Sequence, residues 1–326
     1  MADCALARQA PAPLLSALPV APSPAPAPSV ALVYNPHAGN FCARTLERWR
    51  AALTAAGHAT RLVDSLDYAR APQCHRADIV CIVGGDGTAR LVVEAELRAP
   101  RITTAPALRH ALLPAGTVNL IARETGCGTD PAGLVDALAQ DAAPTLQYHG
   151  LLDGAAFLCC ASVGPDSAVV ARVTPAAKRR WGRAAYGLAL IAQLWRWPRP
   201  ALDVSIDGAA HRAEAVFVLK GRFYAGPWTL DPQADLRRRE FRVLLLPRAR
   251  RRDIARLALA AMVSPRFADP AWQRCSAQTV TVAGQDAVPI QADGDILGQT
   301  PARFSLATAP IAFLSPAARQ TTRDQA

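Results

Sequence analysis

The sequence predicts an α/β fold, with an N-terminal doubly wound parallel sheet followed by a C-terminal β-rich, sandwich-like domain. Residues 30–148 alternate short apolar runs with stretches of helical spacing, which is typical of a parallel sheet covered by helices on both faces. After Pro144 the runs become shorter, and Asp-Gly pairs at 153–154 and 207–208 indicate antiparallel hairpins. The 326 residues are enough to bury two separate cores.

The first domain is expected to span residues 30–148. Its clearest strand, 78–83, is apolar after Asp78 and ends in two glycines, as a fully buried strand of a parallel sheet does. The residues after it have helical spacing and consist mainly of helix formers. In chain order we expect a strand at 30–34, a helix at 42–56, strands near 58–63 and at 78–83, a helix at 89–97, a strand at 112–113 and a helix at 132–140.

The second domain is expected to span residues 149–305. Residues 1–29 form a disordered arm, because 21–29 alternate proline with small residues, and 319–326 form a disordered tail. From Thr145 onward we expect strands at 145–148, 156–161, 202–206, 213–219, 241–246, 279–282 and 290–292, interrupted by helices at 178–194 and 252–262.

The most informative segment is residues 84–88, Gly-Gly-Asp-Gly-Thr, which join the buried strand to a helix. Ligands of open α/β sheets bind at the carboxyl ends of strands and the amino ends of helices. Glycine there lets the backbone approach a phosphate and point N–H groups at it. Thr88 adds a hydroxyl, and Asp86 can hold a magnesium ion or accept a proton. The segment therefore predicts a phosphate site.

Two further turns have a related design. The strand at 30–34 is followed by Asn-Pro-His-Ala-Gly at 35–39, and the strand at 112–113 runs into Pro-Ala-Gly-Thr-Val-Asn at 114–119. Because the carboxyl ends of parallel strands meet at one edge of a sheet, the three turns are expected to form a single site.

These motifs resemble those of the diacylglycerol kinase catalytic-domain family, which includes bacterial lipid kinases and sphingosine kinases. The resemblance covers nearly everything after residue 30. Further on, Ser162 to Asp166 is similar to the family's Ser-x-Gly-x-Asp stretch, 178–186 resembles its Lys-x-x-Gly-x-x-x-Tyr helix, and 293–295 stands where the family has Asp-Gly-Glu. The resemblance implies an ATP-dependent kinase with a cleft between its two domains, and a last strand at about 306–318 that returns to the first domain.

The resemblance also implies roles for individual residues. The general base is Asp295 by analogy with bacterial lipid kinases, or Asp86 by analogy with sphingosine kinases, and Asp166 and Asp293 lie on the substrate side. Asn119 contacts a phosphate or ribose, or caps the following helix. The cofactors implied are ATP and Mg²⁺. The expected nucleotide-binding residues are Asn35, Pro36, His37, Ala38, Gly39, Gly84, Gly85, Asp86, Gly87, Thr88, Ala89, Arg90, Thr117 and Asn119.

Three positions depart from the family pattern. Leu91 stands where a glutamate is common, and Asp295 is one methylene shorter than the usual glutamate. Arginines at 237–239 replace the Asp-Asp-Gly that many bacterial members place at a structural magnesium site, and arginine cannot ligate a cation. We therefore assign no metal ligands. Because Asp86 lies in a turn, we expect its substitution to abolish transfer without loss of stability.

The composition of the chain indicates which partners and which cellular location to expect. With 36 basic and 26 acidic residues the net charge is +10, which favours anionic partners such as a membrane surface. Arginines and aromatic residues interleave at 178–186, as in interfacial helices, or as on a solvated helix face with two core aromatics. The eight cysteines show no disulfide or zinc spacing, and the prolines near 13–20 exclude a signal peptide. We expect a cytoplasmic protein, peripheral at the membrane, that does not bind nucleic acid.

The leading interpretation is a lipid kinase that phosphorylates a hydroxyl of diacylglycerol or a sphingoid-like lipid. An NAD kinase shares Gly-Gly-Asp-Gly, but residues 112–119 and the lack of an Asn-Glu pair after the first motif argue against it. The three departures also fit a nucleotide-binding regulatory protein that does not turn over.

Overall fold

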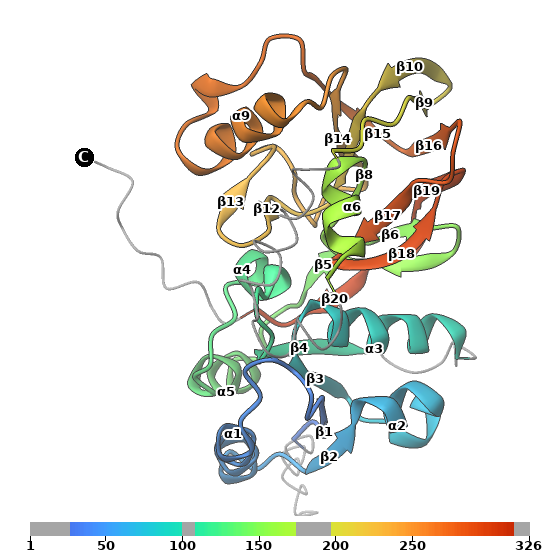
Figure 1. The fold of residues 1–326 in the computed structure, drawn as a ribbon. Helices are drawn as coiled ribbons and strands as arrows, with labels where there is room; N and C mark the ends of the chain where they lie inside the picture. The colour runs from blue at the N-terminus through green and yellow to red at the C-terminus, as the bar shows by residue number, and fades with distance from the viewer. Residues whose placement is uncertain (1–26, 100–107, 174–196, 316–326) are drawn as a thin grey trace, which may run out of the picture.

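A computed structural model describes residues 27–99, 108–173 and 197–315 (Figure 1). The first sheet has the strand order β2-β1-β3-β4-β20-β5. The strands β1 to β4 and β20 run parallel, and β5 lies antiparallel at the edge. Their bounds are β1 Val30–Tyr34, β2 Thr60–Asp64, β3 Ile79–Gly84, β4 Arg109–Pro114, β5 Thr145–Gln147 and β20 Ile311–Phe313.

Helices cover both faces of this sheet, as the alternating sequence pattern predicted. One face packs against α1 (Ala43–Ala55) and α5 (Ala132–Ala139), and the other packs against α3 (Asp86–Arg98). The helix α2 (Ser65–Arg70) lies beside α3 and is followed by a 3-10 turn, η1 (Pro72–His75), while α4 (Leu120–Thr125) follows β4. The doubly wound architecture is therefore confirmed.

The second part consists of two antiparallel six-stranded sheets, which confirms the β-rich expectation. Their orders are β10-β9-β16-β19-β6-β7 and β15-β14-β11-β8-β17-β18. Phe157 lies at the centre of their shared core, with ring centroids 5.9 Å from Phe241 and 6.0 Å from Phe304. The strands are β6 Gly150–Leu152, β7 Ala155–Phe157, β8 Cys160–Val163, β9 Leu202–Ile206, β10 Ala209–Ala213, β11 Ala215–Leu219, β14 Phe241–Leu246, β15 Gln273–Ala277, β16 Thr279–Gly284, β17 Pro289–Ala292, β18 Asp295–Gln299 and β19 Ala302–Leu306.

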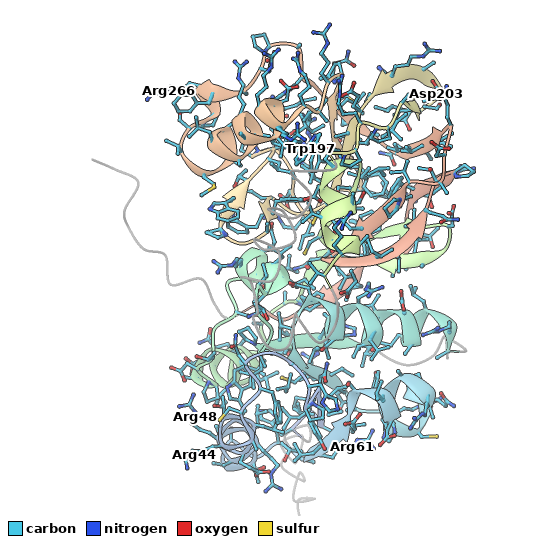
Figure 2. The ribbon with its side chains drawn as sticks, viewed as in Figure 1. Arg44, Arg48, Arg61, Trp197, Asp203 and Arg266 are labelled. Atoms are coloured by element: carbon cyan, nitrogen blue, oxygen red, sulfur yellow. The ribbon has the colours of Figure 1, made fainter. Side chains whose placement is uncertain are left out.

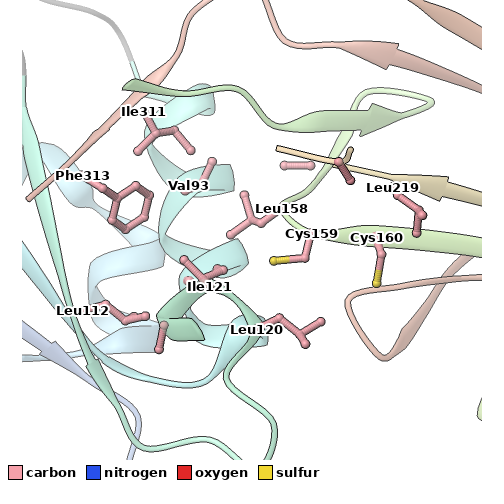
Figure 3. Packing of buried hydrophobic residues seen from close by; sticks show 14 of the residues in the cluster. Val93, Leu112, Leu120, Ile121, Leu158, Cys159, Cys160, Leu219, Ile311 and Phe313 are labelled. Atoms are coloured by element: carbon pink, nitrogen blue, oxygen red, sulfur yellow. The ribbon is translucent and has the colours of Figure 1, made fainter. Parts of the chain in front are cut away.

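A layer of helices and a short hairpin covers the side of the β15-β14-β11-β8-β17-β18 sheet that faces away from the shared core. It comprises α6 (Pro165–Ala171), the hairpin of β12 (Phe223–Tyr224) and β13 (Trp228–Thr229), α9 (Arg251–Met262) and the 3-10 turn η2 (Pro265–Phe267). One apolar cluster runs from this layer into the first part. Figure 3 shows Leu120 and Ile121 of α4 beside Leu158 and Cys159. The boundary between the two parts is therefore packed with apolar side chains.

The structure corrects the expectation of a single strand at 156–161. This segment divides into β7 and β8, which belong to different sheets. The division falls at Leu158 and Cys159, whose N–H groups donate to the carboxylate of Asp293 and not to a neighbouring strand. The predicted helix at 178–194 and most of the two terminal segments lie outside the described residues.

Candidate active site

Three loops meet at the carboxyl edge of the first sheet, as their positions in the sequence predicted. The first loop joins the second where Asn35 N donates to Val83 O (3.0 Å). The second loop joins the third where Ala115 N donates to Gly84 O (2.8 Å). The first loop also joins the third, because Asn40 N donates to Ala115 O (2.8 Å). The backbones of 35–40, 84–88 and 114–119 therefore form one connected platform.

Glycine is required where these loops touch. A Cβ placed on Gly116 would lie 2.4 Å from the Cα of Gly85, and a Cβ on Gly85 would lie 2.8 Å from the Cα of Gly116. A Cβ on Gly39 would lie 2.6 Å from the Oγ1 of Thr117. The middle of the platform is thus bare backbone, a surface that suits phosphate oxygens.

Asp86 is buried, with an exposed fraction of 8%, and both of its carboxylate oxygens are engaged. They accept hydrogen bonds from Leu120 N and Ile121 N, each at 3.0 Å. These are the first N–H groups of α4, which otherwise have no partner within the helix. Asp86 therefore caps the neighbouring helix from the start of α3.

Asn119 does not cap the following helix with its side chain, while its other expected role, contact with a phosphate or ribose, stays a prediction. Its backbone is left-handed (φ 56°), and its side chain makes no cap hydrogen bond to α4. Instead Asn119 Oδ1 accepts from Gly116 N (2.8 Å) and Asn119 Nδ2 donates to Gly116 O (2.9 Å). The residue fixes the shape of the third loop, and Asp86 supplies the cap.

The other predicted nucleotide residues divide into exposed and structural positions. Asn35 Nδ2 donates to the Oγ1 of the buried Thr88 (3.1 Å), and Asn35 Oδ1 accepts from His37 N (2.9 Å). Ala89 is fully buried in the core beneath the loop. Pro36, His37 and Gly39 are exposed, while Ala38, Gly85, Gly87, Arg90 and Thr117 are half-buried.

Asp293 and Asp295 flank the tip of the β17–β18 hairpin and have opposite environments. Asp293 is buried and accepts from Leu158 N (2.6 Å), Cys159 N (2.8 Å) and Cys160 N (3.1 Å). Burial raises the pKa of Asp293 to about 6, against the effect of these hydrogen bonds and with a further contribution from the charge of Asp86. Asp293 therefore anchors the hairpin tip to the backbone.

Asp295 points across the boundary toward the phosphate loop. Its side chain is 40% exposed, and a Cβ on Gly87 would lie 3.5 Å from Asp295 Oδ2. Arg90 Nη2, one turn into α3, donates to the same oxygen at 3.2 Å. The Nε of Arg90 is buried and has no hydrogen-bond partner among the described residues. A partly exposed carboxylate thus lies beside Gly87 of the phosphate loop, paired with a guanidinium that keeps one nitrogen unbonded within the described part of the chain.

Asp166 is part of a polar network behind the same hairpin. Its Oδ2 accepts from Ser162 Oγ and from the hydroxyl of Tyr224, each at 2.5 Å. Gln291 Nε2 lies 3.4 Å from the Tyr224 hydroxyl, and Gln291 Oε1 accepts from Gly294 N (3.0 Å). Burial raises the pKa of Asp166, although both hydrogen bonds act in the opposite direction. The network connects the start of α6 to the hairpin that carries Asp295.

Two family models match successive parts of the chain. The diacylglycerol kinase catalytic domain matches residues 29–148, and the YegS C-terminal NAD kinase beta sandwich-like domain matches residues 160–315. The first part of the chain therefore resembles the diacylglycerol kinase catalytic-domain family. The order of the two models agrees with the two parts of the fold.

Individual relatives extend over both parts of the chain. A diacylglycerol kinase of Staphylococcus haemolyticus is 25% identical over 282 residues, 84% of each chain. A Pseudomonas aeruginosa protein named "Probable lipid kinase YegS-like" is 27% identical over 246 residues, 74% of this chain and 78% of that protein. The crystal structure of a diacylglycerol kinase from Bacillus anthracis superposes with a TM-score of 0.65 and 16% identity, over 89% of this chain and 97% of that one, and this likeness shows the fold.

Charged side chains hold the loop with the three arginines at 237–239, one of the departures from the family pattern. Arg237 forms a forked pair with Asp235, with Nη2 2.7 Å from Oδ2. The ammonium of Lys220, a residue with no exposed surface, donates to the backbone carbonyls of Arg238 and Glu240. Burial lowers the pKa of Lys220 to about 8. Among the described residues no group of three or more His, Cys, Asp or Glu side chains could hold a metal ion.

The sequence motifs predicted the three loops of the site but not several hydrogen-bond partners of its residues. Gly116 belongs to the motif at 114–119, but the sequence does not show that its backbone lies against that of Gly85. Nothing in the sequence marked Tyr224 or Gln291, because they belong to elements with no motif of their own. Among the described residues no helix is long and apolar enough to cross a bilayer. The predicted interfacial segment at 178–186 lies outside the described residues.

Proposed function

We propose that this chain is an ATP-dependent lipid kinase in which Asp295 is the general base. The observation that carries the assignment is the contrast between the two candidate carboxylates. Both oxygens of Asp86 are occupied by backbone N–H groups of α4, whereas Asp295 is partly exposed and lies over Gly87. A base must reach the proton that it removes, and this geometry favours Asp295.

The transfer step follows from this placement. ATP binds with its phosphates on the bare backbone of the three loops, and the acceptor hydroxyl enters between Asp295 and the γ-phosphate. The hydroxyl oxygen forms a bond to the γ-phosphorus as the bond from that phosphorus to the β–γ bridging oxygen breaks, and ADP leaves. The hydroxyl proton passes to the carboxylate of Asp295. Arg90 positions this carboxylate and supplies positive charge beside the transferred group.

Magnesium enters the proposal as the ion that accompanies the ATP phosphates. The described residues offer no cluster of three ligands, and Asp86 has no oxygen free of backbone hydrogen bonds. Neither observation supports a resident metal site. We therefore assign no step of the transfer to a metal held by the protein.

On the acceptor side we assign different roles to the two aspartates suggested by the resemblance. Asp293 is sequestered by three N–H groups and holds the hairpin tip in place. Asp166 is half-buried in the network behind that hairpin, so it orients a polar headgroup next to the base. The name of the Staphylococcus haemolyticus relative supports diacylglycerol as the acceptor, and a sphingoid-like lipid is the second choice.

The test is transfer of label from [γ-³²P]ATP to a panel of lipids, with NAD offered in parallel and products separated by thin-layer chromatography. The proposal expects a labelled lipid phosphate, formed by the wild-type chain and lost in Asp295→Asn. A labelled NADP product would favour the NAD kinase alternative. Tight ATP binding with no labelled product from any acceptor would favour the regulatory alternative.

A further inference from the structure

We propose that the outer face of α9 and the turn after it form a docking surface for an anionic lipid bilayer. This α9 surface consists of Arg251, Arg252, Leu259, Met262, Val263 and Arg266. The inference rests on the proposed function, because an enzyme that phosphorylates a membrane lipid must reach the bilayer that holds it. It names where on this chain the contact is made.

The first observation is a concentration of exposed apolar side chains. Leu259, Met262 and Val263 have exposed fractions of 41%, 54% and 64%, and they lie within five positions of the chain. Single exposed apolar residues are ordinary on a soluble protein, but a group of them is a common mark of an interaction site. The other large hydrophobic residues exposed among the described residues each lie on a different element, with no more than one on any of them: Leu62, Leu66, Leu97, Leu146 and Ile296.

These side chains share one face of a helix that is firmly seated. Arg252, Leu259 and Met262 are separated by seven and three positions, which places them on one side of an α-helix. Leu257 and Ala260 on the other side are buried in the core. The apolar face therefore cannot turn inward without loss of that packing.

The turn that follows α9 is also held in place. Arg256 Nε donates to Phe267 O (2.6 Å), and Arg256 Nη1 lies 2.5 Å from Asp269 Oδ2. These bonds fix η2 against the end of the helix, and the Arg266 guanidinium lies 5.3 Å from the centre of the Phe267 ring. The arrangement of apolar tips and arginine is thus preformed.

The second observation is the charge around these apolar residues. Residues 248–274 contain seven arginines and two aspartates, a net charge of +5 out of +10 for the whole chain. Both aspartates are engaged, Asp253 with Arg250 (2.8 Å) and Asp269 with Arg256. Basic residues flanking apolar tips are the pattern of an interfacial helix, in which the charges meet anionic headgroups and the tips enter the acyl boundary. This complementarity favours a bilayer over a purely apolar partner.

The position of the surface also suits delivery of a lipid to the site. The helix α9 contacts β13, and β12 of the same hairpin contacts α4, whose first N–H groups bind Asp86. In Figure 1, α9, the β12–β13 hairpin and α4 lie on the same side of the molecule. Figure 2 shows Arg266 at the outer end of this region, while Arg44 and Arg48 lie at the opposite end of the molecule.

The experiment is co-sedimentation of the full chain with phosphatidylcholine vesicles, with and without phosphatidylglycerol, at low and high salt. The charge variant is Arg251→Gln/Arg252→Gln/Arg266→Gln, and the apolar variant is Leu259→Gln/Met262→Gln/Val263→Thr. We expect the charge variant to lose affinity for anionic vesicles on the order of 100-fold at low salt. The apolar variant should lose about tenfold or more at both salt concentrations, because burial of its tips is not screened.

Matched controls change the same kinds of residue elsewhere. Arg44→Gln/Arg70→Gln/Arg212→Gln removes the same net charge from exposed sites, and Leu66→Gln removes a leucine as exposed as Met262. Both controls should bind anionic vesicles within about threefold of wild type, because the proposal attributes the affinity to contact at the α9 surface and not to the net charge of the chain. Equal loss in the charge variant and its control would overturn the proposal.

A rival segment and the proposed function are tested separately. If Arg179→Gln/Arg180→Gln/Arg183→Gln abolishes vesicle binding while both α9 variants bind normally, the contact lies in 178–186 and the α9 proposal is wrong. Phosphorylation of a short-chain, water-soluble diacylglycerol should be unchanged in the α9 variants, since they leave the active site intact. Vesicle binding that depends on α9 in a chain with no kinase activity would refute the proposed function and leave the surface standing.

Discussion

Arg90 and Asp295 form an ion pair across the boundary between the two parts of the molecule, with 3.2 Å between Arg90 Nη2 and Asp295 Oδ2. The residues are 205 positions apart in the chain. The pair ties the first turn of α3 to the hairpin tip that carries the proposed base. The position of that base therefore depends on a residue of the phosphate loop's own helix.

Arg90→Gln should reduce kcat on the order of 10-fold to 100-fold, because it releases Asp295 and removes positive charge beside the transferred phosphate. Arg90→Lys should recover part of this loss. Glu94→Gln is the control, because Glu94 Oε1 lies 3.9 Å from Arg90 Nη1 and the change leaves the Arg90–Asp295 pair in place. Steady-state kinetics with a soluble acceptor measures all three variants. Wild-type kcat in Arg90→Gln would show that the pair does not position the base.

Asp86→Asn should lower the free energy of unfolding on the order of 2 kcal/mol, because an amide cannot accept both N–H groups of α4. This prediction replaces the expectation, drawn from the sequence, that Asp86 could be changed without loss of stability. Asp67→Asn is the control, since Asp67 forms an exposed pair with Arg70, and it should change stability by less than about 0.5 kcal/mol. Urea titration followed by circular dichroism gives both values. Equal stabilities for the two variants would contradict the capping role.

Gly116→Ala should destabilise the platform and abolish ATP binding, because the new Cβ would lie 2.4 Å from the Cα of Gly85. The backbones cannot separate without changing the phosphate site. Gly128→Ala is a matched control, with nothing within 4 Å of the added Cβ. Isothermal titration with ATP compares the two variants. Normal ATP affinity in Gly116→Ala would mean that the close approach of the two loops is not needed.

The buried Asp293 gives stability a specific pH dependence. Its folded-state pKa is raised from 3.8 to about 6, so the folded chain binds this proton more tightly than the unfolded chain does. The stabilising effect of protonation is complete below about pH 4 and is lost as the pH rises through about 6. The difference in unfolding free energy between wild type and Asp293→Asn should therefore fall over that window and stay constant above about pH 7. A difference that is independent of pH would contradict a raised pKa.

Local pattern was enough to predict the parts of the fold that are local in origin. The buried strand β3, the glycine loop and α3 follow from one continuous stretch, and the parallel sheet explains why three loops meet. The sequence left the choice of base open between Asp86 and Asp295, since the contacts that separate the two carboxylates are made with distant segments. The division of 156–161 into two strands likewise results from Asp293, a residue more than a hundred positions away. The spacing of apolar residues cannot show that a distant carboxylate accepts the hydrogen bonds that a neighbouring strand would otherwise accept.

The central claim, that Asp295 removes the acceptor proton, is tested most directly by comparing Asp295→Asn with Asp295→Glu. Both are measured for lipid phosphorylation and for ATP affinity in the same preparation. We predict that Asp295→Asn lowers kcat on the order of 100-fold or more while ATP affinity stays within a few-fold of wild type. Asp295→Glu should keep substantial activity, because it retains a carboxylate about one methylene from its original position. A fully active Asp295→Asn enzyme would contradict the assignment.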